Sequence, residues 1–237
     1  YPRMGSNFSA SLQLTPPYSL FRKKDLGTLD ANGNPTKVSS YKDINYDKWS
    51  SADRYKWIEY HKWKVSGELY TKVIGDFVIM TRAQFGYLGY YNRKWGYSPF
   101  EGFRVGGDGM SGYDTYGADI IALRGYENYY LTPWEATPYN SNGYYAGNVY
   151  DKFTMEFRYP VILQPQSTIF VLGFLEGGNC WSDIKKFNPF QIKRSAGVGV
   201  RVFLPMIGLL GIDWGYGFDN PVKKNRSQFH FLIGQQF

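Results

Sequence analysis

The chain ends on FHFLIGQQF, residues 229–237, and this stretch predicts an amphipathic β-strand. Successive side chains of a strand point to opposite faces of its sheet, so every second residue shares a face. The face that is almost wholly apolar carries Phe229, Phe231, Ile233 and Phe237. A terminal strand with such a face needs a neighbouring strand, together with either a protein core or lipid to cover it.

The composition of the chain favours lipid. Its 237 residues include 22 Tyr, 17 Phe and 7 Trp, which is well above the aromatic content of an ordinary soluble domain. Yet the mean hydropathy is −0.43, and no run approaches the ~18 to 20 consecutive apolar residues of a membrane-spanning helix. Membrane-spanning β-strands reconcile these facts, because they alternate apolar and polar residues. We therefore predict an all-β fold, a transmembrane antiparallel up-and-down β-barrel.

Eight segments have the alternation expected of such strands. They are residues 5–14, 57–73, 77–90, 152–163, 168–177, 195–204, 209–219 and 229–237. The connections between them run long, short, long, short, medium, short, medium. Outer-membrane barrels have short periplasmic turns and longer extracellular loops. We expect an integral protein of the bacterial outer membrane, with its C-terminus on the periplasmic side so that every short turn is periplasmic.

Cysteine content and charge exclude several classes of function. Cys180 is the only cysteine, so an internal disulfide is impossible. The net charge is +7, but the basic residues are scattered, and we predict no nucleic-acid partner. His61 and His230 lie on separate predicted strands, and there is no cluster of metal ligands and no phosphate-binding loop. The sequence thus predicts no metal, no cofactor and no catalytic residue, and we expect that the protein is not an enzyme.

Four motifs follow one another in a fixed order along the chain. They are IALRGYEN at 121–128, FLEGGNCW at 174–181, SAGVGVRVFLPMIGLLGIDWGYGF at 195–218, and the closing FHFLIGQQF. Their order and spacing resemble the BamA family of outer-membrane protein assembly factors, relatives of two-partner secretion transporters. Barrels of that family have sixteen strands. The resemblance implies that residues 1–237 are the C-terminal half of the barrel, strands nine to sixteen, with the first barrel strands and the periplasmic POTRA domains absent.

Arg124, Gly125 and Tyr126 resemble the Arg-Gly-aromatic signature in the family's sixth extracellular loop. Arginine is a permanently charged planar donor, and glycine permits a tight reversal of the backbone, so the pair suits a loop that docks on a carboxylate. In the family this loop folds into the barrel lumen, which implies an acidic partner on the inner wall. The candidate partners are Glu176, which replaces the commoner Asp of the family motif, and then Asp213 and Glu156.

The resemblance implies an insertase, which folds and inserts other β-barrel proteins through a lateral seam at the terminal strand. The seam residues would be Phe229, Phe231, Ile233, Gly234 and Phe237. Glycine weakens packing inside a strand, so we expect Gly234 to help this strand kink. The implied partners are unfolded β-barrel clients, outer-membrane lipids and lipopolysaccharide, accessory lipoproteins and the rest of the barrel itself. A two-partner secretion type export channel shares the loop motif and is the alternative, and a porin is a third option.

Overall fold

The computed structural model describes residues 1–18, 57–93, 96–109, 117–137, 140–164, 167–205, 208–220 and 226–234. These residues are mostly in β-strands. No helix within the described ranges has the length and apolar character needed to cross a membrane.

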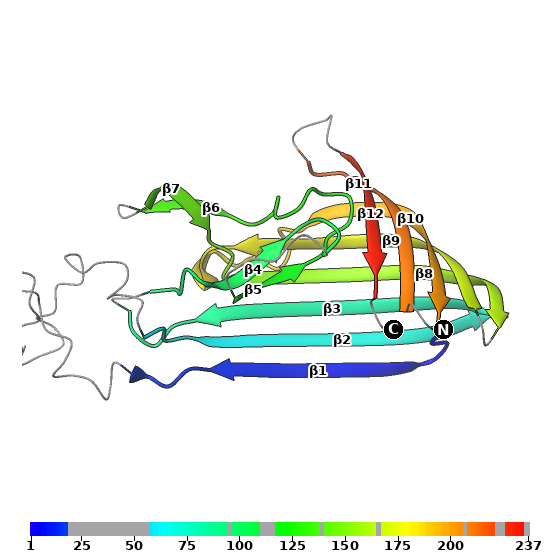
Figure 1. The fold of residues 1–237 in the computed structure, drawn as a ribbon, viewed down its shortest axis with the longest axis horizontal. Coiled ribbons are helices and arrows are strands. Elements are labelled where there is room, and N and C mark those ends of the chain that lie inside the picture. Colours follow the sequence, from blue (N-terminus) through cyan, green and yellow to red (C-terminus); the bar gives the residue numbers. More distant parts are fainter. Residues whose placement is uncertain are drawn as a thin grey trace, which may run out of the picture.

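One eight-stranded antiparallel sheet forms the body of the molecule (Figure 1). Its strands are β1 (Gly5–Leu14), β2 (His61–Ile74), β3 (Phe77–Gly89), β8 (Val149–Gln164), β9 (Ser167–Trp181), β10 (Lys193–Leu204), β11 (Gly208–Gly217) and β12 (Ser227–Ile233). Neighbours in the sheet are neighbours in the sequence, except that β3 pairs with β8. The sheet is open, with β1 and β12 at its two edges.

All eight predicted strands are present, which confirms the predicted all-β antiparallel fold, but some bounds differ from the prediction. The second strand begins at His61 instead of residue 57, and the fifth continues to Trp181. The last strand ends at Ile233, because Gly234 has a φ of 74°, a left-handed conformation that breaks an extended run. Residues 235–237 of the predicted strand lie outside the described residues, so the expected kink at Gly234 stays a prediction.

The two faces of the sheet differ in the way that the alternation predicts. On β8, the exposed side chains of the outer face are Phe153, Met155 and Tyr159, and the buried side chains of the inner face are Thr154, Glu156 and Arg158. The outer face of the last three strands is also apolar and exposed, with Val198, Val200, Ile212, Trp214, Phe229 and Phe231. A soluble domain would bury the apolar face and expose the charges. The observed arrangement suits strands between lipid and a polar interior.

The connection between β3 and β8, residues 90–148, is here called the insert, and of its described residues those around β4 lie against the inner face of the sheet. It contains a parallel pair, β4 (Glu101–Val105) with β5 (Gly117–Ile121), and an antiparallel pair, β6 (Trp134–Thr137) with β7 (Asn140–Tyr145). The sequence had predicted only a long connection here. Strand β4 contacts β3, β8 and β9 of the main sheet, as Figure 1 illustrates.

Both apolar packing and ion pairs fix the insert to the sheet. The ring of Phe103 in β4 packs on Tyr150 of β8 with 4.7 Å between centroids, within a buried hydrophobic cluster. Lys62 of β2 is only 1% exposed. Its Nζ lies 2.9 Å from a carboxylate oxygen of Glu101 and 2.9 Å from one of Asp119, and both acids belong to the insert.

Gly86 tests whether this close contact holds the insert in place. A Cβ atom at Gly86 would overlap the ring of Tyr150 and lie 2.7 Å from Cζ of Phe103, so Gly86→Val must displace both rings. We expect a loss of about 1–3 kcal/mol in the free energy of unfolding and faster proteolysis of the insert. Gly67→Val is the matched control, because there a Cβ would meet only Phe8, at 3.8 Å. Equal behaviour of the two valine variants in limited proteolysis would contradict this account.

Candidate functional site

The insert turns at Arg124, Gly125 and Tyr126, here called the tip, and the tip lies against the inner face of the sheet. Just before it, an isolated bridge between Gly107 and Leu123 fixes the chain, with the Leu123 N–H donating to the Gly107 carbonyl at 3.1 Å. Arg124 and Tyr126 are both buried. The tip therefore contacts this inner face of the sheet, here called the wall, away from bulk water.

The guanidinium of Arg124 lies among three carboxylates that come from three strands. Its Nη2 is 2.7 Å from Oε1 of Glu156 in β8 and 2.8 Å from Oε1 of Glu176 in β9. Its Nη1 is 3.1 Å from Oδ2 of Asp213 in β11. The backbone N–H of Arg124 also donates to Glu176, at 2.9 Å. The structure thus brings Arg124 together with all three acidic residues that the sequence nominated, not with Glu176 alone.

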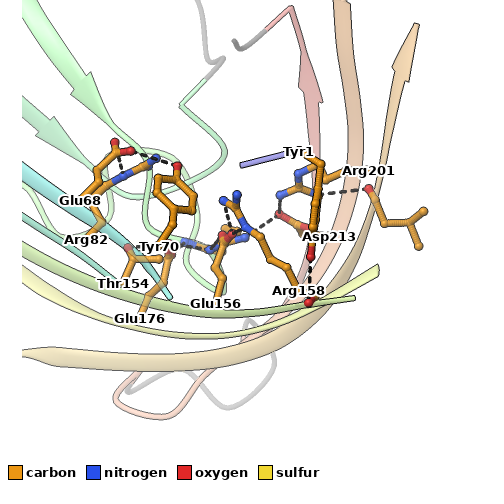
Figure 2. A network of polar contacts seen from close by, with 12 residues as sticks. Tyr1, Glu68, Tyr70, Arg82, Thr154, Glu156, Arg158, Glu176, Arg201 and Asp213 are labelled. Atoms are coloured by element: carbon orange, nitrogen blue, oxygen red, sulfur yellow. Dashed lines mark hydrogen bonds and ion pairs between the residues drawn. The ribbon is translucent and has the colours of Figure 1, made fainter. Parts of the chain in front are cut away.

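Each of these carboxylates holds a second cation, which sequence reasoning did not identify. Lys152 Nζ is 3.0 Å from Glu176, Arg158 Nη2 is 2.7 Å from Glu156, and Arg201 Nη1 is 2.6 Å from Asp213. Figure 2 shows Glu156, Arg158, Arg201 and Asp213 projecting from the strands toward one another. We call the whole set the ion cluster; it comprises Arg124, Lys152, Glu156, Arg158, Glu176, Arg201 and Asp213. The inward positions of β8 and β10 were the available signal for these cations.

The electrostatics of the ion cluster keep Arg124 charged and in place. Burial alone would lower its pKa, but the attraction of Glu176, Glu156 and Asp213 outweighs this and raises the pKa above its ordinary value. One face of the guanidinium also covers the ring of Phe174, 3.7 Å from the centroid. Removing one partner of a buried ion pair costs about 3–5 kcal/mol. The tip is therefore stable only where the three carboxylates are reached together.

Gly125 allows the tip to rest directly on the backbone of β11. Its φ is 88°, and a Cβ there would lie 2.9 Å from the carbonyl carbon of Tyr216 and 3.0 Å from the nitrogen of Gly217. A Cβ at Gly215 would in turn lie 2.7 Å from the Gly125 nitrogen. The Gly125 N–H donates to Nε2 of His230 in β12 at 2.8 Å. Sequence reasoning gave His230 no role.

Tyr126 completes the contacts of the tip with the wall. The side chain is fully buried, and its hydroxyl donates to the carbonyl oxygen of Arg194 in β10 at 2.8 Å. Burial raises the pKa of Tyr126 to about 12, so the hydroxyl keeps the proton that it donates. Through three consecutive residues the tip thus contacts each of the last five strands, β8 to β12.

The seam residues that the sequence nominated lie apart from the ion cluster. Phe229, Phe231 and Ile233 are exposed on the outer face of β12, the opposite face from His230. Gly234 follows the strand, and its N–H donates to the Leu209 carbonyl at 2.9 Å. Phe237 lies outside the described residues.

No group of His, Cys, Asp and Glu suited to a metal ion occurs in the described part of the chain. In the ion cluster each carboxylate already faces two cations, for example Asp213 with Arg124 and Arg201. The cluster is arranged to hold the tip in place.

Comparison with known proteins identifies a family for most of the chain. Residues 27–237 match the model of the Omp85 superfamily domain. No curated protein matches the chain. Among solved structures, it is similar to the crystal structure of BamA from Haemophilus ducreyi lacking POTRA domains 1–3, with 16% sequence identity and a TM-score of 0.49. The match covers 74% of this chain and 35% of that one, so the chain spans about a third of the length of that structure.

Two glycines separate the strain of a left-handed backbone from the close fit of the tip. Gly125→Ala and Gly75→Ala both place a side chain at a positive φ, 88° and 57°, which costs about 1–2 kcal/mol. Only at Gly125 does the added Cβ meet the wall, because nothing lies within 4 Å at Gly75. We expect Gly125→Ala alone to release the tip, detected as faster proteolysis of the insert. A similar release in Gly75→Ala would rule out the close fit as its cause.

Proposed function

The chain belongs to the Omp85 superfamily of outer-membrane β-barrel proteins, and on this basis we propose that it acts as an insertase for other barrels. Such a protein folds β-barrel clients and inserts them into the bacterial outer membrane through a lateral seam beside β12. The reaction uses backbone pairing, without a nucleotide or cofactor. Every N–H and C=O group of a client strand must be satisfied before it enters lipid, and an exposed strand edge offers those partners.

The observation that carries the proposal is the reach of the tip across β8 to β12. Strand β12 pairs with β11 along one side only, and lies at the edge of the described sheet. An unpaired edge is a template for another strand. The tip contacts every strand from the ion cluster to this edge, through Arg124, Gly125 and Tyr126. This arrangement supports an insertase in which the buried tip is coupled to a terminal strand that can exchange pairing partners.

The position of the insert favours an insertase over a porin. The insert lies on the polar inner face that would line a conducting path, and the ion cluster and Lys62 hold it there. A permanently open channel would need this face to be accessible to water. A porin has no comparable use for a buried tip, whereas the export channel shares the loop motif and is separated from an insertase only by its substrate.

The proposed partners follow from the two faces of the sheet. Unfolded β-barrel clients would pair with the free edge of β12, where Phe229, Phe231 and Ile233 already face outward. Lipids and lipopolysaccharide would cover the apolar outer face. The tight turns, such as the one at Gly75, all lie at one end of the sheet, and we place that end and the C-terminus in the periplasm, where accessory lipoproteins and the rest of the protein would meet the client.

Arg124→Ala in the full-length protein tests the proposal. It leaves Glu156, Glu176 and Asp213 without their shared cation, and the loss of one partner of a buried ion pair costs ~3–5 kcal/mol. An increase of ~1.4 kcal/mol in the barrier to client folding would already slow it tenfold. We expect at least about a tenfold lower rate of client folding in lipid vesicles, while the variant itself still inserts, as judged by heat-modifiable migration on gels. Arg124→Lys should also be impaired, because an ammonium cannot reproduce the planar fork that contacts several carboxylates.

Arg194→Ala is the matched control, because this arginine forms an exposed ion pair with Asp219 and meets the tip only through its backbone. Its client folding should match that of the unmodified protein. Normal client folding and normal levels of outer-membrane proteins in Arg124→Ala cells would refute the proposal. Loss of export of one dedicated substrate, with normal client folding, would instead favour the secretion channel.

A further inference from the structure

His230 links the tip of the insert to the terminal strand by a direct hydrogen bond. Its Nε2 accepts from the Gly125 N–H at 2.8 Å, and its side chain is only 4% exposed. Because the partner is a backbone N–H, Nε2 must carry a lone pair, so the ring is neutral and its proton is on Nδ1. Few other side chains can supply a buried acceptor at this place. The contact therefore depends on the type of residue at 230 and not on its volume alone.

The position of His230 gives this bond its leverage on the strand. It lies at the middle of β12 on the inner face, and in the sheet it is paired with Asp213 of the ion cluster. Every residue of β12 pairs with β11, and no other main strand holds it among those described. On its outer face, Phe229 and Phe231 are exposed. The inner face is thus where something other than β11 can restrain the strand.

We propose that His230 is a positioning residue, a latch through which the docked tip holds the terminal strand against β11. While the ion cluster holds Arg124, the adjacent Gly125 N–H is fixed in space, and His230 is fixed with it. Pulling β12 away leaves that N–H without a partner in a buried place, which is unfavourable. Undocking of the tip removes the restraint. The state of the insert then determines how readily the strand separates. The use of this latch in client insertion rests on the proposed function, but the latch itself does not.

Hydrogen exchange of the full-length protein in lipid nanodiscs measures the latch without any client. We expect His230→Leu, which keeps the volume but loses the acceptor, to speed exchange of the β12 amides at least about tenfold relative to β10. His230→Gln keeps an acceptor at similar reach and should restore much of the protection. Leu232→Ala is the control, because it removes packing from the same face of the same strand and leaves the hydrogen bond intact. It should not deprotect the Gly125 amide.

A double variant distinguishes a latch from general loosening of the strand. Arg124→Lys should undock the tip and speed exchange of β12, and adding His230→Leu should then change little, because both act through the same contact. Additive effects, or a Gln variant as fast as Leu, would overturn the proposal. If His230→Leu does not fold, the unmodified protein still decides: the Gly125 amide must be protected, and rapid exchange there ends the idea. If the exchange rates are as expected but His230→Leu folds clients at the normal rate, the latch stands and its use in client insertion is refuted. Failure of the proposed function itself is read separately, from client folding by Arg124→Ala.

Discussion

The attraction between one buried guanidinium and three carboxylates is the constraint on which the rest of this structure depends. Arg124 reaches Glu156, Glu176 and Asp213 from a chain segment that lies far from them in sequence. Buried charges are costly unless they are paired, and the stabilisation is lost if any partner moves away. The insert is therefore placed by a condition that must be met on β8, β9 and β11 at once. Lys152, Arg158 and Arg201 keep the carboxylates themselves compensated, so the wall tolerates the acidic residues that the tip requires.

The close approach of backbones around the tip follows from that constraint. With the Arg124 guanidinium among the carboxylates, the next residue, Gly125, lies directly on the backbone of β11, and glycines on both sides make this possible. Gly125 lacks a side chain toward the wall, and Gly215 and Gly217 lack side chains toward the tip. The hydrogen bonds to His230 and from Tyr126 then use the polar groups that this approach buries. Charge, glycine placement and hydrogen bonding thus agree on one position for the tip.

The sequence predicted the sheet well because the alternation of side chains is a local signal. The inward positions of Glu156, Glu176 and Asp213 followed from the same period of two, and the family motif pointed to Arg124. What depends on contacts between distant segments was missed. Strands β4 and β5 are five residues each and form a parallel pair on the wall, with no periodicity to reveal them. His230 was overlooked because its partner is a backbone N–H, which leaves no trace in a residue pattern. The left-handed conformation of Gly234 at the end of β12 is likewise a property of the backbone that side-chain alternation does not report.

Lys62 extends the consequence of these contacts across the sheet. It holds the insert to β2 through Glu101 and Asp119, while Arg124 holds the same insert to β8, β9 and β11. The insert is thereby held to the main sheet at two places, on β2 and on the group β8, β9 and β11. Because the insert connects β2 with β8, β9 and β11, a change in the curvature of the sheet must deform the insert or break one of these sets of contacts. The curvature of the sheet is therefore coupled to whether the ion pairs of Lys62 and of Arg124 are both intact.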